Sequence, residues 1–284
     1  RNARIISLYK ARDGRDMGNY RDISLHSVLG KLYATVLNQR LSDYLETNGQ
    51  IATAQNGFRS ATMQDGRMVR SDRGCQDHLF TFGETLKHRR EVLKKDTHLF
   101  FLDFSKAFDT CDHDCLFVKL AKEGVKGKLL ASIIRFYKNM KAVATINGTD
   151  SDPFQLKVGT AQGCPLSPTL FNVYINDLVQ ELTNHLPNIQ VSCLAYADDI
   201  VVMADDESSL QELIHICHRW TTQWRMESKV DHENPKTAVM KIPAQRRRRK
   251  QEANNAPETD FCGVMRRCPK LTAISTWVLS STTS

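Results

Sequence analysis

Residues 195–204 read AYADDIVVMA, in which two apolar, β-rich runs flank the acidic pair Asp198 and Asp199. Runs of this length and composition predict two strands joined by a tight turn. Adjacent carboxylates repel each other and are costly to hold beside a hydrophobic core unless a cation neutralises them. The stretch therefore predicts a β-hairpin with a metal-binding tip, although a lone Asp-Asp pair is also common in solvated turns.

A third carboxylate follows another predicted strand earlier in the chain. The apolar run 98–102 has the length of a strand and is followed directly by Asp103. A fold that pairs this strand with the hairpin would bring Asp103 beside Asp198. Carboxylate oxygens suit Mg²⁺, which keeps water and substrate phosphates in its remaining coordination positions.

Helical periodicity surrounds these strands. Apolar residues recur at helical spacing in residues 29–45, 129–140, 170–182 and 210–224, and a further helix is predicted near 78–94. Gly49 ends the first of these helices, Ser167 and Pro168 begin the third, and Ser208 caps the fourth.

The remaining segments complete an α+β pattern. Residues 143–146 and 154–158 predict a hairpin with an extended turn at Asn147 and Gly148, and the polar segment 61–77 predicts a loop. Strands and helices are mixed without strict alternation. We therefore expect an α+β fold with an antiparallel sheet and helices packed on one face.

The distribution of charge limits what the net charge can indicate. The chain has 284 residues, 41% hydrophobic and 25% charged, with a net charge of +7. Residues 243–284 hold eight Lys and Arg against three acidic residues, net +5, which leaves +2 for residues 1–242. A nucleic-acid site in the body must therefore come from the arrangement of its charges.

The sequence shows no signal for a membrane or for secretion. The longest run without charge, 158–176, contains two prolines and two glycines, which argue against a membrane span. No basic and apolar leader precedes the first methionine, Met17, and the chain reads as a piece of something longer. Eight cysteines without paired CxxC units predict reduced thiols, so we expect an intracellular protein of the nucleus or cytoplasm.

Three strings in order resemble the palm motifs of the reverse transcriptase domain of non-LTR (LINE-type) retrotransposons. These strings are FLDFSKAFDT (101–110), GTAQGCPLSPTLFN (159–172) and AYADDIVVMA (195–204). NYRDISL (19–25) and QNGFR (55–59) are similar to the two finger motifs of the family, and NPKTAVM (234–240) is similar to the motif after the catalytic hairpin. The resemblance covers residues ~4 to ~242.

The resemblance implies a right-hand polymerase. Residues 1–95 would form the fingers and part of the palm, 96–242 the catalytic palm, and 243–284 a basic tail that is disordered or aberrant. The implied activity is that of an RNA-directed DNA polymerase, which adds dNTPs to a primer 3′-hydroxyl by two-metal phosphoryl transfer. Its partners would be an RNA template, a DNA primer and dNTPs, with two Mg²⁺ ions, or Mn²⁺, as cofactors and no membrane.

Catalytic roles follow from the resemblance position by position. Asp103 and Asp198 would be the bridging carboxylates, with the backbone carbonyl of Phe104 as a further metal ligand. Asp199 would be a supporting acid, and Tyr196 would lie against the primer end.

The resemblance also implies a nucleotide site. Phe108, five residues after Asp103, would exclude a ribose 2′-hydroxyl by steric clash, so that the product is DNA. The Gln162-Gly163 loop would cover the base pair being formed. Arg21 and Arg59 would clamp the triphosphate, because a guanidinium can hold phosphate oxygens in a bidentate fork.

Other charged residues have less defined roles. Lys236 would donate a proton to the departing pyrophosphate, and Lys10 and Arg15 are alternatives for a further triphosphate contact. Asp109 is interpreted as a structural carboxylate outside the metal site.

The chain departs from the family pattern in ways that leave alternatives open. It lacks an upstream endonuclease, and residues 243–284 do not resemble a thumb. The basic run Arg246 to Lys250 could be a nuclear address, a phosphate-binding arm or noise from a decayed element. An inactive relic that at most binds RNA is therefore the alternative function, whereas Phe108 disfavours an RNA polymerase of the same architecture.

Overall fold

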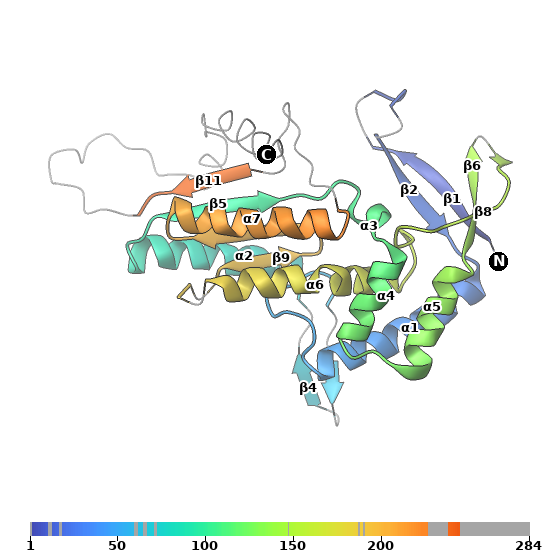
Figure 1. Cartoon of the computed structure of the whole chain (residues 1–284), viewed down its shortest axis with the longest axis horizontal. Helices are drawn as coiled ribbons and strands as arrows, with labels where there is room; N and C mark the ends of the chain where they lie inside the picture. Colours follow the sequence, from blue (N-terminus) through green and yellow to red (C-terminus); the bar gives the residue numbers. More distant parts are fainter. Residues whose placement is uncertain are drawn as a thin grey trace.

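A computed structural model describes residues 2–10, 13–16, 19–59, 62–64, 67–70, 73–146, 148–186, 188–189, 191–226 and 238–244. Within these residues the chain forms a five-stranded sheet, a four-stranded sheet and a two-stranded hairpin. The two larger sheets lie towards opposite ends of the molecule, and helices fill the space around and between them (Figure 1).

The five-stranded sheet, here called the outer sheet, is built around a parallel pair. Its order is β2 (Tyr20–Leu25), β1 (Asn2–Tyr9), β6 (Lys141–Ile146) and β7 (Thr149–Asp150), and β8 (Phe154–Gln155) also pairs with β6. β1 runs antiparallel to β2 and parallel to β6. The predicted hairpin is confirmed by β6, β7 and β8. The pairing of β1 with β6 joins residues on the two sides of position 95, and the division into fingers and palm at that position stays a prediction.

The four-stranded sheet, here called the central sheet, carries the predicted acidic hairpin. Its order is β11 (Ala238–Ile242), β5 (Thr97–Leu102), β10 (Asp199–Ala204) and β9 (Cys193–Tyr196). All of its pairings are antiparallel. The apolar runs before and after Asp198 and Asp199 are therefore the paired strands β9 and β10, and the run before Asp103 is the central strand β5.

The helices form where apolar residues recur at helical spacing. They are α1 (Val28–Thr47), α2 (Cys75–Lys87) continued by a π-helical turn (His88–Val92), α3 (Ala107–Thr110), α4 (His113–Lys122), α5 (Gly127–Lys138), α6 (Ser167–His185) and α7 (Glu207–Gln223). α6 is buried on almost every side and forms the centre of the main core. None of the helices in the described ranges is long and apolar enough to cross a membrane.

Two predicted helix starts differ from the structure by one or two residues. Ser167 is the first residue of α6, and its hydroxyl donates a hydrogen bond to the carbonyl of Ala161 rather than capping the helix. α7 is capped by Asp206, whose carboxylate accepts from the amide of Ser209, so the prediction of Ser208 as the cap was wrong. Asp and Ser are both good N-caps, and spacing alone does not choose between neighbours.

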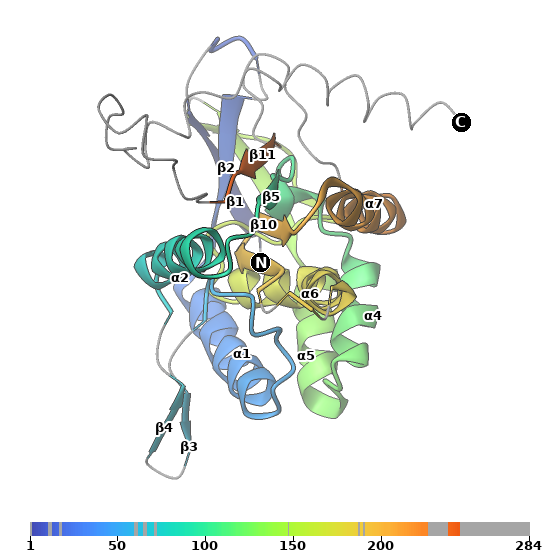
Figure 2. The ribbon, with the colours of Figure 1, turned by 90° about the vertical axis from the view of Figure 1, so that its left-hand side faces the viewer.

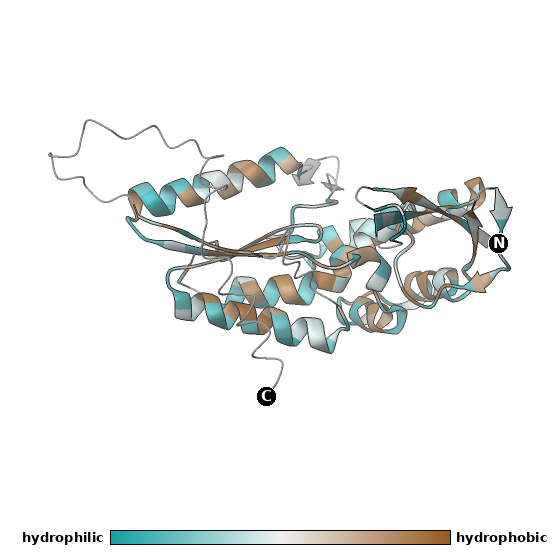
Figure 3. Cartoon of the chain, turned by 90° about the horizontal axis from the view of Figure 1, so that it is seen from above, coloured by the Kyte–Doolittle hydropathy of each residue, from teal (hydrophilic) through white to brown (hydrophobic). Residues whose placement is uncertain are grey.

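The α+β prediction is confirmed, but the helices are not confined to one face of the central sheet. Phe100, Leu102 and Val202 point into the main core with α6 and α7. Leu99 and Met203 point to the opposite face, where Phe82 and Leu86 of α2 and other residues form a second apolar cluster. Figure 3 shows helices against both broad faces of this sheet. The prediction of a one-sided sheet was therefore wrong, because α2 covers the second face.

The polar segment predicted as a loop contains a short hairpin. β3 (Thr62–Gln64) pairs antiparallel with β4 (Arg67–Arg70), and α2 begins at Cys75 within the same predicted loop. The hairpin projects away from the body of the molecule (Figure 2). A projecting hairpin does not need an apolar face, which explains why apolar patterning did not reveal it.

Candidate active site

The three predicted catalytic aspartates gather at one end of the central sheet. Leu102 is paired with Ile200, so the antiparallel register continued by one residue places Asp103 level with Asp199. Asp198 lies in the turn that joins β9 to β10. Asp103 and Asp198 are half-buried and Asp199 is exposed. The fold therefore brings together carboxylates that are 95 residues apart in the sequence.

The turn between β9 and β10 has an unusual backbone. Ala197, one of its two residues, has a φ of +56°, in the left-handed region, and its side chain is buried. The segment of Gln55 and Gly57 packs directly against it. The carboxamide of Gln55 bonds both the backbone N–H and the carbonyl of Ala197, at 2.9 and 3.2 Å.

Phe108 lies in α3, shortly after Asp103, and its ring is held by two other rings. It stacks on Phe171 of α6 at 4.6 Å between centroids, and the ring of Phe58 meets it edge-on at 6.0 Å. Phe108 is half-buried, so part of its ring remains accessible. This ring is therefore positioned as a rigid, partly open wall.

The Gln162-Gly163 loop links the outer sheet to the residue after Phe108. The side chain of Gln162 donates a 2.8 Å hydrogen bond to Asp109, and its backbone carbonyl accepts from the amide of Ser24 in β2. Gly163 has a φ of +100°, and a Cβ there would lie 3.0 Å from the carbonyl oxygen of Ser24. Only glycine fits this backbone and this close approach without strain.

The carboxyl group of Asp109, which is hydrogen-bonded to this loop, has a raised pKa. Burial raises the pKa of its carboxyl group, against the hydrogen bond from Gln162, which lowers it. Asp22 and Lys10 also act on this carboxyl through space. Asp22 of the outer sheet and Lys10, directly after β1, are therefore near enough to this carboxyl group to influence its pKa.

Tyr196, the last residue of β9, is packed beside a histidine from α2. The ring centroids of Tyr196 and His78 lie 5.6 Å apart, and His78 Nδ1 lies 3.1 Å from the side-chain nitrogen Nδ2 of Asn56. Burial lowers the pKa of His78, which favours the neutral ring. Tyr196 is half-buried beside the acidic turn, and its contact with a primer end stays a prediction.

The two predicted phosphate clamps have different environments. Arg21 is exposed on β2, where it pairs with Leu8 of β1. The side chain of Arg59 is 1% exposed. Its guanidinium group donates to both carboxylate oxygens of Glu46, at 2.7 and 2.5 Å, and to the carbonyls of Ala52 and Gln55. Arg59 therefore ties α1 to the following loop, and its role as a triphosphate clamp stays a prediction. Its position in a motif could not show that α1 supplies a buried carboxylate.

Of the three other cationic residues predicted near the triphosphate, the structure describes two. Lys10 and Arg15 are both exposed, in the segment that connects β1 to β2. The backbone amide of Arg15 donates to Asp13. Lys236 lies outside the described residues.

The carboxylates fit a divalent metal ion by their chemistry. Asp103 and Asp198 offer hard oxygen ligands at neighbouring strand ends. Among the residues that the structure describes, no three His, Cys, Asp or Glu side chains form a metal site by themselves. Two carboxylates leave coordination positions for water and substrate phosphates, which is the usual arrangement for Mg²⁺. The side chain of Phe104 is buried against Trp220, so only its backbone could contribute.

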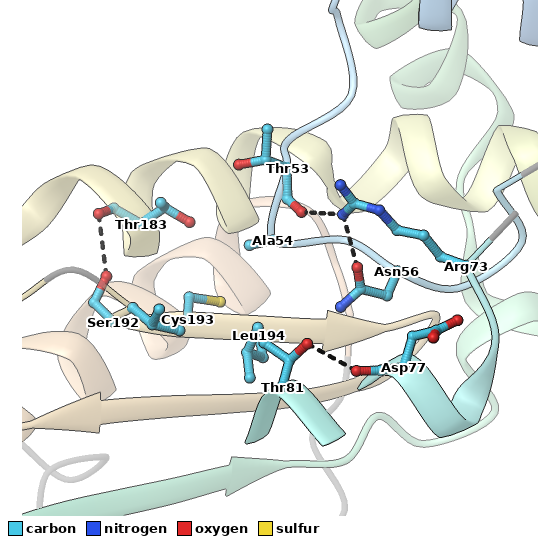
Figure 4. A pocket seen from close by; sticks show the side chains of 11 residues that line it. Thr53, Ala54, Asn56, Arg73, Asp77, Thr81, Thr183, Ser192, Cys193 and Leu194 are labelled. Carbon is cyan, nitrogen blue, oxygen red and sulfur yellow. Dashed lines mark hydrogen bonds between the residues drawn. The ribbon is translucent and has the colours of Figure 1, made fainter. Parts of the chain in front are cut away.

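A polar pocket of about 490 Å³ lies beside β9, on the side of α2. Figure 4 shows Arg73 reaching the carbonyl of Thr53 and the side chain of Asn56, and Ser192 bonded to Thr183. None of the three catalytic aspartates lines this pocket. It is therefore separate from the carboxylate site, although Asn56 belongs to the segment that packs against the acidic turn.

A match between this chain and a protein-family model agrees with the ordered motifs and their geometry. Residues 10–264 match the family model described as reverse transcriptase (RNA-dependent DNA polymerase). The chain belongs to this family. Reverse transcriptases use divalent metal ions, in keeping with the carboxylates at the end of the central sheet.

Relatives of this reverse transcriptase come from mobile elements. The chain is 28% identical over 231 residues to the RNA-directed DNA polymerase from mobile element jockey of Drosophila funebris, covering 78% of this chain and 24% of that protein. It is 27% identical to the retrovirus-related Pol polyprotein from type-2 retrotransposable element R2DM of Drosophila melanogaster, covering 75% and 19%. The chain thus spans about a quarter of these relatives or less, and the resemblance to retrotransposon reverse transcriptases is confirmed.

Solved structures share the polymerase fold. Telomerase from Candida tropicalis superposes with a TM-score of 0.58 at 13% identity, covering 92% of this chain and 42% of that one. The RNA-dependent RNA polymerase of a human picobirnavirus has a TM-score of 0.50 at 12% identity, covering 84% and 41%. At these identities the likeness shows the fold alone, and it confirms the right-hand polymerase architecture.

Two residues near the site gain importance only in the structure. Asp109, interpreted from the sequence as a structural carboxylate, accepts a hydrogen bond from the side chain of Gln162. Phe171 supports the ring of Phe108 although 63 residues separate the two in the sequence. Both belong to the motif strings, but a string does not show which members contact each other.

Proposed function

We propose that this chain is the catalytic core of an RNA-directed DNA polymerase of a retrotransposon, which adds dNTPs to the 3′-hydroxyl of a primer. The observation that carries the proposal is the meeting of Asp103 with Asp198 and Asp199 at one end of the central sheet. The family match supports the same reaction. Residues 1–95 would contribute the fingers and part of the palm, and 96–242 the catalytic palm.

The carboxylates would hold the metal ions. Asp103 and Asp198 would be the direct ligands with the carbonyl of Phe104, and Asp199 would add negative charge beside them. Mg²⁺, or Mn²⁺ in its place, would stabilise the charge that develops on the entering and leaving oxygens of an in-line displacement at the α-phosphorus.

The side chains around the carboxylates would position the reactants. Tyr196 would lie against the primer end, and Gln162 and Gly163 would cover the new base pair. Arg21 would bind the triphosphate, because it lies in a motif string and its side chain is exposed on β2. Lys10 is favoured over Arg15 as a further triphosphate contact, since it acts electrostatically on Asp109. Lys236 would protonate the departing pyrophosphate.

The sugar would be selected by shape. The ring of Phe108 is fixed between Phe171 and Phe58, so it cannot move aside for a 2′-hydroxyl without disturbing both contacts. A rigid wall of this kind discriminates by clash and requires no hydrogen bond. The substrates would therefore be dNTPs and the product DNA.

The partners and the compartment follow from the reaction. The enzyme would bind an RNA template and a DNA primer and would act inside the cell, in the nucleus or cytoplasm. The six described cysteines are all free thiols, which supports a reducing compartment.

Primer extension tests the proposal. The full chain would be incubated with a labelled DNA primer annealed to an RNA template, dNTPs and Mg²⁺. Extension that copies the RNA sequence and stops when EDTA removes the metal is the expected result. Retained RNA binding without extension, from folded protein, would overturn the proposal in favour of an inactive relic that only binds RNA.

A further inference from the structure

The catalytic turn contains a residue in an unfavourable conformation. Ala197 joins β9 to β10 directly before Asp198, with a φ of +56°. A residue with a Cβ rarely adopts the left-handed region, because the Cβ approaches the following backbone. Strain of this kind persists only where the surroundings impose it. The position of Asp198 therefore depends on whatever holds Ala197 in place.

One side chain bonds both polar backbone groups of Ala197. The carboxamide of Gln55 donates from Nε2 to the Ala197 carbonyl at 3.2 Å, and its Oε1 accepts from the Ala197 N–H at 2.9 Å. The same Oε1 accepts from the amide of Gly57 at 2.8 Å. Gln55 is 1% exposed, so water does not compete for these groups.

The backbone beside Gln55 is itself fixed to the hairpin. The amide of Asn56 donates to the carbonyl of Ala195 at 2.7 Å, and the amide of Ala195 donates to the carbonyl of Ala54 at 2.9 Å. Residues 54–56 thus run alongside β9 through a parallel bridge between Gln55 and Ala195. The side chain of Gln55 is held at a fixed distance from the turn.

The same segment approaches the turn as closely as a backbone can. A Cβ on Gly57 would lie 2.3 Å from the nitrogen of Ala197, so no other residue fits there without displacement. Asn172 of α6 donates a 2.8 Å hydrogen bond to the carbonyl of Gly57 and is buried. The central helix therefore supports the segment from behind.

We propose that Gln55 is a positioning residue that holds the turn at Ala197 and thereby places Asp198 beside Asp103. A carboxamide suits this role because it is both a donor and an acceptor, whereas Glu lacks the donor and Met lacks both. Gln55 contacts neither substrate nor metal in this account. The inference rests on the proposed function, because it assumes that the turn places Asp198 for metal binding and nucleotide addition.

The test combines two substitutions in the full chain. Gln55→Met removes the hydrogen bonds and keeps the volume, and Ala197→Gly removes the Cβ that makes a positive φ unfavourable. Ser192→Ala is the matched control, since Ser192 is also buried and bonds two backbone carbonyls, but at the far end of β9. Mn²⁺ binding by electron paramagnetic resonance and single-dNTP incorporation are measured for each variant.

Gln55→Met should weaken Mn²⁺ binding about tenfold, the shift expected from the net contribution of one or two hydrogen bonds. Incorporation should fall by a similar or larger factor, and the Mg²⁺ concentration for half-maximal rate should rise. In the Ala197→Gly background, Gln55→Met should reduce Mn²⁺ affinity and the incorporation rate by much smaller factors. Ser192→Ala should lower thermal stability without changing either metal measurement. If Gln55→Met does not fold, Gln55→Asn replaces it in the test. Its side chain is one methylene too short to bond both groups of Ala197, so the losses of Mn²⁺ affinity and incorporation should be in the same direction but smaller.

Two results would overturn the inference while leaving the proposed function intact. The first is wild-type metal binding and incorporation in folded Gln55→Met or Gln55→Asn. The second is an equal loss in the Ala197 and Ala197→Gly backgrounds, which would mean that Gln55 acts only through general stability. Wild-type protein that neither binds Mn²⁺ nor extends a primer would instead overturn the proposed function, and the inference with it.

Discussion

Gln162 donates a 2.8 Å hydrogen bond to Asp109, and this bond joins the loop before α6 to the residue directly after Phe108. The backbone carbonyl of Gln162 accepts from Ser24 of β2. One glutamine thus connects the outer sheet, the loop and α3. The proposed nucleotide site is assembled from segments that are far apart in the sequence, and the contacts between them lead to specific predictions.

Asp109 should give the protein a measurable pH dependence of stability. Burial raises the pKa of its carboxyl group, so the folded state holds a proton more tightly than the unfolded state. Its contribution to stability therefore falls as the pH rises from the unfolded pKa through the raised folded pKa. Asp109→Asn, which keeps an acceptor for Gln162, should gain in melting temperature relative to wild type between pH 4 and pH 7.

Asp112 supplies the matched control for this prediction. It caps α4, and the hydrogen bond from the amide of Cys115 is the main cause of its lowered pKa. Its contribution to stability is present above the unfolded pKa and is lost as the pH falls. Asp112→Asn should therefore show the opposite trend, and equal trends for both variants would contradict the account.

Phe108→Ala should relax the choice of sugar. Removing the ring opens the space that a ribose 2′-hydroxyl needs, so incorporation of rNTPs relative to dNTPs should rise by on the order of ten- to a hundredfold. Competitive single-nucleotide incorporation measures this ratio. Phe154→Ala, at a partly exposed position in β8, should leave it unchanged. An unchanged ratio in Phe108→Ala would remove Phe108 from the proposed site.

Arg59 should matter for stability and not for nucleotide binding. Breaking its buried ion pair with Glu46 leaves an uncompensated charge, so Arg59→Ala should lower the free energy of unfolding by about 3–5 kcal/mol. Arg40→Ala, on the exposed side of α1, should change it by no more than about 0.5 kcal/mol. Urea denaturation measures both values. A raised KM for dNTP in Arg59→Ala without loss of stability would instead support the predicted triphosphate role of Arg59.

Lys119 should give the free energy of unfolding a second dependence on pH, in the alkaline range. Its ammonium group lies between the carboxylate of Asp177, at 2.6 Å, and the ring of Trp224, 3.8 Å from the centroid. Burial lowers its pKa to about 8, although Asp177 raises it. The unfolded chain then binds more protons than the folded protein between about pH 8 and the ordinary lysine pKa of 10.5, so the free energy of unfolding should rise with pH across this window.

Lys119→Met tests this effect against an exposed lysine. The free energy of unfolding of Lys119→Met should lack the alkaline rise that wild type and Lys128→Met share. Chemical denaturation at pH 7.5, 9 and 10 measures the three curves. Parallel curves for all three proteins would show that Lys119 keeps its ordinary affinity for protons when folded.

The central strands and their acidic ends could be predicted because their sequence signals are local. The runs before Asp103 and around Asp198 are apolar and bounded by charge, and the structure pairs them as β5, β9 and β10. The second helix layer also has a local signal, in strand β5. Thr97 to Leu102 is almost entirely buried, and a strand that is apolar at consecutive positions is typical of a sheet covered on both faces.

Other features could not be predicted from local signals. Arg59 finds its partner Glu46 only because α1 turns back against the loop, and Gln55 finds Ala197 across 142 residues of sequence. Such contacts depend on tertiary packing, which a single sequence does not specify residue by residue. The difference between Asp206 and Ser208 as the cap of α7 has a simpler cause, since both residue types cap helices well.

The most direct test of the central claim is the rate of single-dNTP addition to a DNA primer on an RNA template, with wild type, Asp198→Asn and Asp152→Asn compared at equal folded concentration. Asp152 is an exposed aspartate near the outer sheet and serves as the control. Wild type and Asp152→Asn should add the nucleotide, and Asp198→Asn should add none above background. Equal addition by all three proteins would contradict the assignment of catalysis to the carboxylates of the central sheet.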